Sequence, residues 1–389
     1  MCRAFGQIIG RFVNPAVKIR PLCLLFPLLL LAASPAPAQT NAPKVNSSLL
    51  PNLANLTNQA SQVIPTNRPH VVLPFQVVVI ETAEASELKA LTNQARTFLT
   101  TKDYDGLDDF LDKLRSSKKS WATGRWKLSD AYSGLIPADD ASDAEWIGRL
   151  AALRHWIAAK PESISARVAL ADFLTAFAWK ARGSGWANTV TEEGWQLFRQ
   201  RLDESMNVLN EAAHLKAKCP ELWVVKMRSA LGLQYEKPQF NDIFDEAIRF
   251  APDYEAYYYR RAIYLLPRWS GEPGEWENDL AQSADRLGGK DGDELYARVV
   301  WSIHKYGSAD VFKENNLSWA RVDRGFEGIV ESFPNSVAAN SERANLAVLA
   351  RDRRKARRYF DQTHGLVDLS VWASRDHFVR YANWVYWQP

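Results

Sequence analysis

Apolar residues recur three and four residues apart along most of the chain beyond residue 85, which is the period of an amphipathic helix. The pattern predicts a first helical hairpin over residues 86–115. Turn residues then indicate a loop over 116–139. Because this loop carries Trp121 and Trp126, we expect it to pack against the helices instead of projecting into solvent.

A repeated register begins after the next apolar stripe, which runs from Trp146 to Ile157 and ends before Pro161. Four prolines are each followed by alanine ten residues later: Pro161 by Ala171, Pro220 by Ala230, Pro252 by Ala262, and Pro334 by Ala344. A proline stops a helix and a small residue lets two helices cross closely, so the register predicts stacked helical hairpins. The predicted pairs are 162–181 with 195–217, 221–235 with 240–250, 253–266 with 276–287, 293–306 with 318–332, and 335–350 with 351–362.

The pattern changes before residue 86. Residues 39–69 are polar and rich in proline, show no sustained period, and are predicted to form a tether. The β-branched run from Val71 to Ile80 contains Pro74 and predicts a short extended segment or an edge strand. We therefore expect an all-α solenoid of helical hairpins over 86–389, with an aromatic C-terminal cap, preceded by a tether and extended segment over 39–85.

The first 38 residues have the three regions of a secretory signal peptide. Four basic residues and no acidic residue precede an apolar run from Leu22 to Ala33, and Ala36-Pro37-Ala38 is a small-x-small cleavage pattern. Because this run is shorter than the roughly 20 residues that span a bilayer, we expect cleavage near Ala38 and export to the periplasm or the extracellular space. The alternative is an uncleaved N-terminal anchor.

Removing this segment changes the charge of the chain. The full chain has 48 Lys and Arg residues, of which four are lost with this segment, and 45 Asp and Glu residues, of which none is lost. The exported form therefore has 44 basic and 45 acidic residues, and its net charge is −1. A near-neutral chain lacks the basic footprint of a nucleic-acid-binding protein. Cys219 is the one cysteine that remains, which excludes an internal disulfide, so about 350 residues must be stabilised by their core.

The proline and alanine spacing resembles the tetratricopeptide (TPR) repeat, in which a proline closes one unit and a small residue lies at the crossing of helices A and B. Only Tyr258 fits the early aromatic position of that family, which is otherwise filled by Arg167, Lys226 and Asn340. Two motifs, Ala178–Ala187 and Pro267–Glu272, are similar to an uncharacterised bacterial family with a TPR-like domain of unknown function. The resemblance implies the solenoid fold and no particular activity.

Two glycine-bearing loops are the most site-like segments, because both are predicted to join helix A to helix B and thus to lie on one edge of the solenoid. Their candidate binding residues are Arg182, Trp186 and Glu193 in the first loop, and Arg268, Trp269 and Glu272 in the second. The alternative is that both tryptophans plug the ends of helix pairs. Tyr258, beside two arginines, is a further candidate for contact with an extended peptide or a glycan.

No motif predicts catalysis, a cofactor or a metal site: the histidines are single, and no P-loop, H-E-x-x-H or nucleophile elbow is present. The basic segment Arg351–Arg358 suits a solvated face, an acidic partner or anionic lipid head groups. We therefore expect a non-catalytic scaffold that binds a protein or peptide partner and does not span a membrane. The alternatives are an enzyme or binder of cell-envelope polymer, glycan or peptide, using the loops Arg182–Glu193 and Arg268–Glu275, and an assembly subunit with no site of its own.

Overall fold

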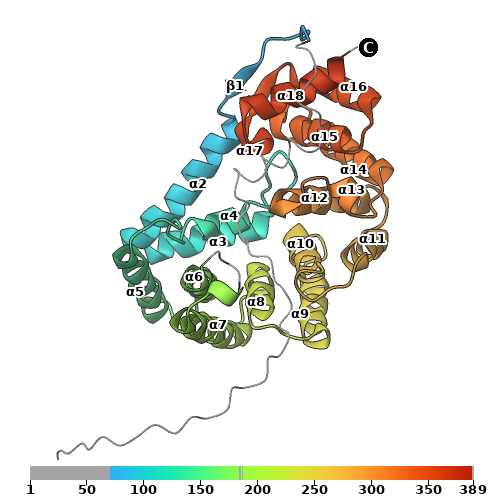
Figure 1. The fold of residues 1–389 in the computed structure, drawn as a ribbon. Coiled ribbons are helices and arrows are strands. Elements are labelled where there is room, and N and C mark those ends of the chain that lie inside the picture. The colour runs from blue at the N-terminus through green and yellow to red at the C-terminus, as the bar shows by residue number, and fades with distance from the viewer. Residues whose placement is uncertain (1–70, 184, 186, 388–389) are drawn as a thin grey trace, which may run out of the picture. The chain divides into compact units, whose positions relative to one another are not determined.

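The computed structural model describes residues 71–183, 185 and 187–387. The predicted signal segment, the tether up to residue 70 and Trp186 lie outside these residues. The described chain is mostly helical, with one small two-stranded sheet, so the predicted all-α class is confirmed (Figure 1).

Most helices pack in antiparallel pairs that follow each other along the chain. The pairs are α2 (Ala83–Thr100) with α3 (Tyr104–Ser117), α6 (Ile164–Arg182) with α7 (Glu192–Ala213), α8 (Glu221–Gly232) with α9 (Lys237–Phe250), α10 (Glu255–Tyr264) with α11 (Glu275–Leu287), α12 (Gly289–Gly307) with α14 (Trp319–Ser332), and α15 (Val337–Leu349) with α16 (Arg353–Thr363). Helix α8 packs on both α6 and α10, and α10 packs on α12. We call the surface formed by these four first helices the A-helix face.

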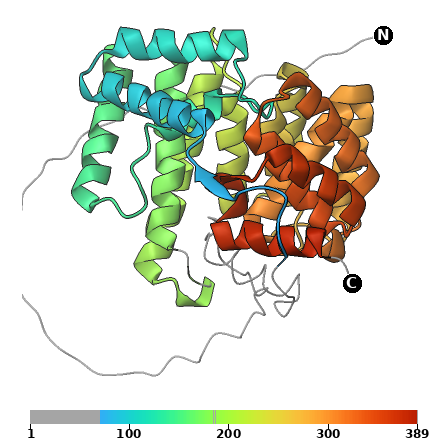
Figure 2. The ribbon, with the colours of Figure 1, turned by 90° about the horizontal axis from the view of Figure 1, so that it is seen from above.

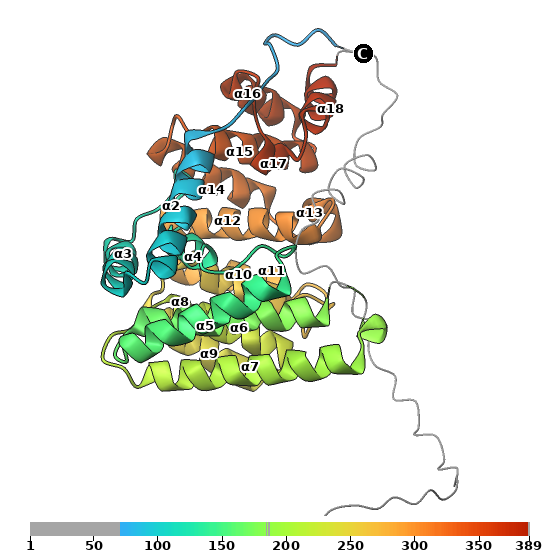
Figure 3. The same cartoon turned by 90° about the vertical axis from the view of Figure 1, so that its left-hand side faces the viewer.

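Local sequence signals explain where these helices begin. The side chains of Ser142, Ser163 and Thr191 each accept a hydrogen bond from the backbone N–H three residues later, which caps α5 (Asp143–Ala159), α6 and α7. Helices α5, α6 and α7 lie side by side in Figure 3. The caps thus fix the starts of the helices that build the first part of the A-helix face.

The predicted crossing alanines are at the contacts between helices. Ala171, Ala230, Ala262 and Ala344 are all at most 3% exposed. The α12–α14 hairpin, which has no proline and alanine pair of this kind, uses glycine instead. A Cβ atom on Gly325 of α14 would lie 2.1 Å from the backbone oxygen of Asp293 in α12. Only a residue without a side chain fits there.

Several details differ from the sequence-based expectation. The predicted loop 116–139 contains the short helix α4 (Leu128–Ser133), and α13 (Val311–Glu314) lies between α12 and α14. Trp121 and Trp126 are buried as expected. Ile147 is exposed, although it belongs to the apolar stripe of α5, because Trp146, Leu153 and Trp156 form the buried face of that helix.

The predicted extended segment contributes β1 (Val78–Ile80), which pairs in parallel with β2 (Leu366–Asp368). Val78 is opposite Leu366 in this register. In Figure 2 the blue strand β1 lies beside the red C-terminal elements, which include α17 (Leu369–Trp372) and α18 (Arg375–Tyr386). The N-terminal part of the described chain is therefore attached to its C-terminal part.

Candidate functional site

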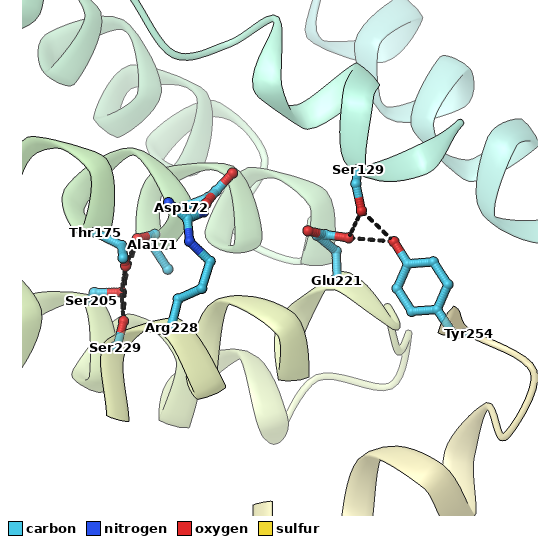
Figure 4. Close-up of polar contacts among 9 residues, drawn as sticks. All are labelled: Ser129, Ala171, Asp172, Thr175, Ser205, Glu221, Arg228, Ser229 and Tyr254. Carbon is cyan, nitrogen blue, oxygen red and sulfur yellow. Dashed lines mark hydrogen bonds and ion pairs between the residues drawn. The ribbon is translucent and has the colours of Figure 1, made fainter. Parts of the chain in front are cut away.

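Three buried hydroxyl groups join α6, α7 and α8 beneath the A-helix face (Figure 4). The Thr175 Oγ1 atom lies 2.8 Å from Ser229 Oγ and 3.0 Å from Ser205 Oγ. Ser205 Oγ also donates to the Ala171 carbonyl oxygen at 2.9 Å. Because each hydroxyl has a partner within the protein, the cluster satisfies polar groups between closely packed helices and serves packing.

An ion pair crosses from α6 to α8 one position away from this cluster. Arg228 Nη1 donates to Asp172 Oδ1, and the Asp172 side chain is almost fully buried (Figure 4). Arg228 itself is half-buried. A buried carboxylate needs a positively charged partner. Arg228 neutralises Asp172 and so links the α6–α7 hairpin to the α8–α9 hairpin.

The Glu221 carboxyl, at the first turn of α8, is 3% exposed. Its Oε2 atom accepts hydrogen bonds from the Tyr254 hydroxyl at 2.5 Å and from Ser129 Oγ at 2.7 Å (Figure 4). Burial raises the pKa of Glu221 to about 7, and the negative charge of Asp172 raises it further against the effect of the two hydrogen bonds. This carboxyl therefore changes its protonation near neutral pH and fastens α4 to two repeats.

Arg260, in α10, is a half-buried cation without a counter-ion. Among the described residues, its guanidinium makes no hydrogen bond or ion pair, and its Nε atom is buried. The guanidinium carbon lies 5.1 Å from the ring centre of Tyr259. Burial lowers the pKa of Arg260 from its ordinary value, the positive charge of Arg228 lowers it further, and Glu221 and Asp172 oppose this effect. Arg260 thus belongs to the same charge cluster as the ion pair.

Aromatic side chains continue this cluster toward α12. The rings of Tyr259 and Tyr306 meet edge to face, with centres 6.4 Å apart. The guanidinium carbon of Arg268 lies 4.4 Å from the ring centre of Tyr306. Burial raises the pKa of Tyr259, and the nearby charges of Arg260 and Arg268 lower it. One polar and aromatic surface is therefore made by arginines and tyrosines of α8, α10 and α12, together with Arg268 in the loop that follows α10.

Trp269 of the second predicted loop contacts helix α6 just before the first predicted loop, whose own Trp186 lies outside the described residues. The ring of Trp269 meets that of Trp179, which precedes the first loop, edge to face at 6.2 Å between centres. Arg182 lies between Trp179 and Trp195, with its guanidinium carbon 5.6 Å and 5.3 Å from their ring centres. It also donates to the carbonyl oxygens of Gly183 and Gly185. Arg182 is therefore buried, and its hydrogen bonds stabilise the start of the first loop.

The remaining predicted site residues lie in different surroundings. Glu193 and Glu272 are exposed, and Trp269 is half-buried. Tyr258, the further candidate for contact with a peptide or a glycan, is 6% exposed: its ring packs on Phe244, and its hydroxyl donates a hydrogen bond to the Pro252 carbonyl oxygen at 2.7 Å. Tyr258 points between helices because its position on α10 faces the second helix of the preceding hairpin.

No sequence motif marks Asp172, Glu221 or Arg260 as functional. One signal was present: Glu221 and Glu255 lie 34 residues apart and each begins a first helix of a hairpin. Burial also raises the pKa of Glu255 to about 7, and its Oε1 atom accepts a hydrogen bond from the Trp126 backbone N–H. The two glutamates share the first position of a helix, although their separation differs from the 32 residues between Ala230 and Ala262.

Two further properties concern only the part of the chain that the structure describes. There, no group of three or more His, Cys, Asp or Glu side chains is placed to hold a metal ion. None of the described helices is both long and apolar enough to cross a membrane.

Comparison with known proteins adds one match to a family. Residues 91–240 match a family described as a domain of unknown function, DUF4034. This range contains the Ala178–Ala187 motif, on which the resemblance to a family of unknown function was based in part, whereas Pro267–Glu272 lies beyond it. No curated protein matches the chain.

Two solved structures show a distant likeness. A monomeric mutant of IFIT1 with Gppp-AAAA is 11% identical, with a TM-score of 0.25, over 76% of this chain and 64% of that chain. A human IFIT1 dimer with m7Gppp-AAAA is 11% identical, with a TM-score of 0.23, over 80% of this chain and 72% of that chain. This chain thus spans less than two thirds of the first of them, and TM-scores this low support no conclusion about its ligand.

Proposed function

We propose that this protein is a non-catalytic binding scaffold that holds an acidic segment of a protein or peptide partner on its A-helix face. The observation that supports this proposal is the half-buried guanidinium of Arg260, which has no counter-ion among the described residues. A cation removed from water without a partner carries an unfavourable desolvation free energy. A carboxylate supplied by a bound partner compensates that free energy at the moment of binding.

The neighbours of Arg260 suit such a partner. Arg228 is already paired with Asp172, whereas Arg260 and Arg268 form no ion pair with a carboxylate of the described chain. Tyr259 and Tyr306 add aromatic area beside them. Tyrosine and arginine are the residues that most often dominate the free energy of protein–protein binding. A peptide with an acidic and an apolar side chain matches this arrangement.

The compartment of the partner follows from the N-terminal sequence. The sequence pattern of residues 1–38, with a cleavage site near Ala38, supports export to the periplasm or the outside of the cell, where the partner would also be found.

A second candidate function uses the edge that carries the two predicted loops. The ring of Trp269, in the second loop, contacts Trp179, in the last turns of α6 before the first loop. Glu193 and Glu272, one in each predicted loop, are exposed. Aromatic rings beside carboxylates also suit a glycan chain of the cell envelope, which would bind at this edge instead of at Arg260.

The test is to select random linear peptides by display against the full chain and against an Arg260→Met variant. The wild type is expected to enrich peptides that contain Asp or Glu. The variant is expected to bind the same peptides at least about tenfold more weakly, because a hydrogen bond to a charged group contributes about 1.5–3 kcal/mol. Its thermal stability should stay level or rise, because methionine replaces an unpaired buried charge.

Arg199→Met is the matched control, because Arg199 is an exposed arginine on α7, away from the A-helix face. It should enrich the same peptides as the wild type with the same affinity. Identical peptides and affinities from all three proteins, together with a lower melting temperature of Arg260→Met, would show that Arg260 serves packing only. The second candidate would be favoured if envelope glycan fragments bind equally to the wild type, Arg260→Met and Arg199→Met, and if Trp269→Ala abolishes that binding.

A further inference from the structure

A basic cavity lies between α14, α15 and α16, away from the A-helix face cluster. Its volume is about 530 Å³. It is lined by Ala320, Asp323, Arg324, Glu327, Arg343, Arg354, Lys355, Arg358 and Tyr359. Five of these nine residues are cationic and two are acidic, so the lining carries a net charge of +3. Pockets for small ligands commonly have about 300–1,000 Å³, so the cavity has the size of a ligand site.

One of the two carboxylates is already fully engaged within the protein. Asp323 is buried and accepts hydrogen bonds from Arg343 Nε at 3.0 Å, Lys355 Nζ at 2.7 Å and the Tyr359 hydroxyl at 2.7 Å. The Arg343 guanidinium carbon also lies 4.1 Å from the ring centre of Tyr359. Asp323 therefore fixes the floor of the cavity and cannot neutralise further cations.

The cations at the mouth of the cavity are less well compensated. Arg324 Nε is bonded to Asp293 Oδ2 at 2.9 Å. Arg354 and Arg358 lie four residues apart on α16, and in the described chain neither takes part in a hydrogen bond or an ion pair. Like charges at this spacing repel each other across one face of a helix.

The position of the cations within α16 adds a second unfavourable interaction. The helix begins at Arg353, so Arg354 and Lys355 lie in its first turn, beside the positive end of the helix dipole. Cations stabilise the last turn of a helix and destabilise the first turn. A bound anion would compensate both the dipole and the repulsion between Arg354 and Arg358.

We propose that this cavity binds a phosphate dianion, either on a soluble phosphate ester or on a lipid head group. The planar guanidinium groups of Arg354 and Arg358 match the oxygens of a phosphate group, to which each can donate two parallel hydrogen bonds. The buried Asp323 network holds Lys355 and Arg343 in place behind them. The proposal is independent of Arg260, because it rests on other helices and on another ligand chemistry.

The experiment uses the full chain and two probes. Isothermal titration with inorganic phosphate, against chloride at equal ionic strength, measures binding of the soluble dianion. Flotation with phosphatidylcholine vesicles, with and without phosphatidic acid, measures binding of the same group on a lipid. We expect saturable binding in at least one arm and a loss of about tenfold or more in the affinity of Arg358→Gln.

Arg357→Gln is the matched control, because it removes the same charge from the same helix at a residue that does not line the cavity and stacks on Tyr386. It should bind as the wild type does. Binding of phosphate alone identifies a soluble ligand, and binding only to vesicles with phosphatidic acid identifies a lipid head group. No binding in either arm, or an equal loss in Arg357→Gln and Arg358→Gln, overturns the proposal.

Discussion

At the scale of single residues, the buried side chains of Glu221 and Glu255 link segments that are distant in sequence through hydrogen bonds. Glu221 receives hydrogen bonds from Ser129 of α4 and from Tyr254, and Glu255 receives one from the Trp126 backbone. Both glutamates begin a first helix of a hairpin, and burial raises the pKa of each to about 7. The segment 121–133 is therefore attached to two successive hairpins through a glutamate at the start of the first helix of each.

The raised pKa of Glu221 predicts a dependence of stability on pH. In the unfolded chain this carboxyl loses its proton near pH 4.5, whereas the folded protein retains it up to about pH 7. The unfolded state therefore binds fewer protons in this window, so the contribution of Glu221 to the free energy of unfolding falls as pH rises from about 4.5 to about 7. Chemical denaturation of Glu221→Gln should show a stability, relative to wild type, that increases across this window.

Glutamine keeps an oxygen that accepts the hydrogen bonds of Ser129 and Tyr254, so the comparison isolates the charge. Glu211→Gln, at an exposed position of α7, is the matched control and should differ from wild type by a constant amount. A constant difference for Glu221→Gln as well would contradict the assignment of a raised pKa.

At the scale of elements, the hairpins pack closely wherever a small residue lies at the crossing. Alanine fills that role at Ala171 and Ala230, and glycine fills it at Gly325, whose missing side chain admits the backbone of α12. Gly292 does the same between α12 and α11, where a Cβ atom would lie 2.1 Å from the backbone oxygen of Ala284. The proline and alanine register is thus one of two sequence solutions to the same packing requirement.

Enlarging a crossing residue should separate its helices. Ala230→Leu adds bulk at a fully buried position of α8 and should lower the free energy of unfolding by about 1–3 kcal/mol. Ala151→Leu, at an exposed position within α5, is the matched control and should stay within about 0.5 kcal/mol of wild type. Equal effects of the two substitutions in denaturant unfolding would mean that Ala230 is not a crossing point.

Charged neighbours in the same helices would not serve as neutral controls. The sequence suggests that Arg228 and Arg260 are less buried than the alanines and insensitive to change. Both arginines are indeed less buried than the alanines, but we do not expect them to be insensitive to change, because Arg228 forms an ion pair with Asp172 and Arg260 lies within the charge cluster. Substitution at either position changes electrostatic interactions as well as packing.

At the scale of the whole molecule, contacts far apart in sequence hold the described chain together. Strand β1 pairs with β2 near the C-terminus. Arg298 of α12 donates from its Nε atom to the Thr123 carbonyl oxygen at 2.9 Å. The loop 116–139 is therefore bonded both to α10, through Glu255, and to α12. Loss of these long-range contacts should affect several hairpins at once, unlike loss of a contact within one repeat.

The fate of the N-terminus is also a property of the whole molecule. If the basic region, the Leu22–Ala33 run and Ala36-Pro37-Ala38 form a signal peptide, the protein purified from its natural host should begin at or near Gln39. N-terminal sequencing checks this directly. A variant with arginine in place of Leu29 interrupts the apolar run and should accumulate uncleaved. Wild-type protein that is soluble in the cytoplasm and retains Arg3 would rule out export.

The sequence by itself determined the class of the fold and most helix positions. The apolar period, the capping residues Ser142, Ser163 and Thr191, and the prolines between units are local signals, and local hydrogen bonds and sterics decide where a helix begins and ends. The burial of the crossing alanines could also be predicted from the sequence, because it depends on their small size and on their repeated spacing after a proline.

Only the tertiary structure decided which polar side chains are paired, buried or left without a partner. Tyr258 and Arg260 are two residues apart on one helix. The ring of Tyr258 packs on Phe244, whereas Arg260 forms no ion pair with any described residue. The surroundings of each depend on which neighbouring helix faces it, and the partner of Arg228 comes from a different hairpin. Charge pairing and burial are set by contacts between segments distant in sequence, so no local pattern specifies them.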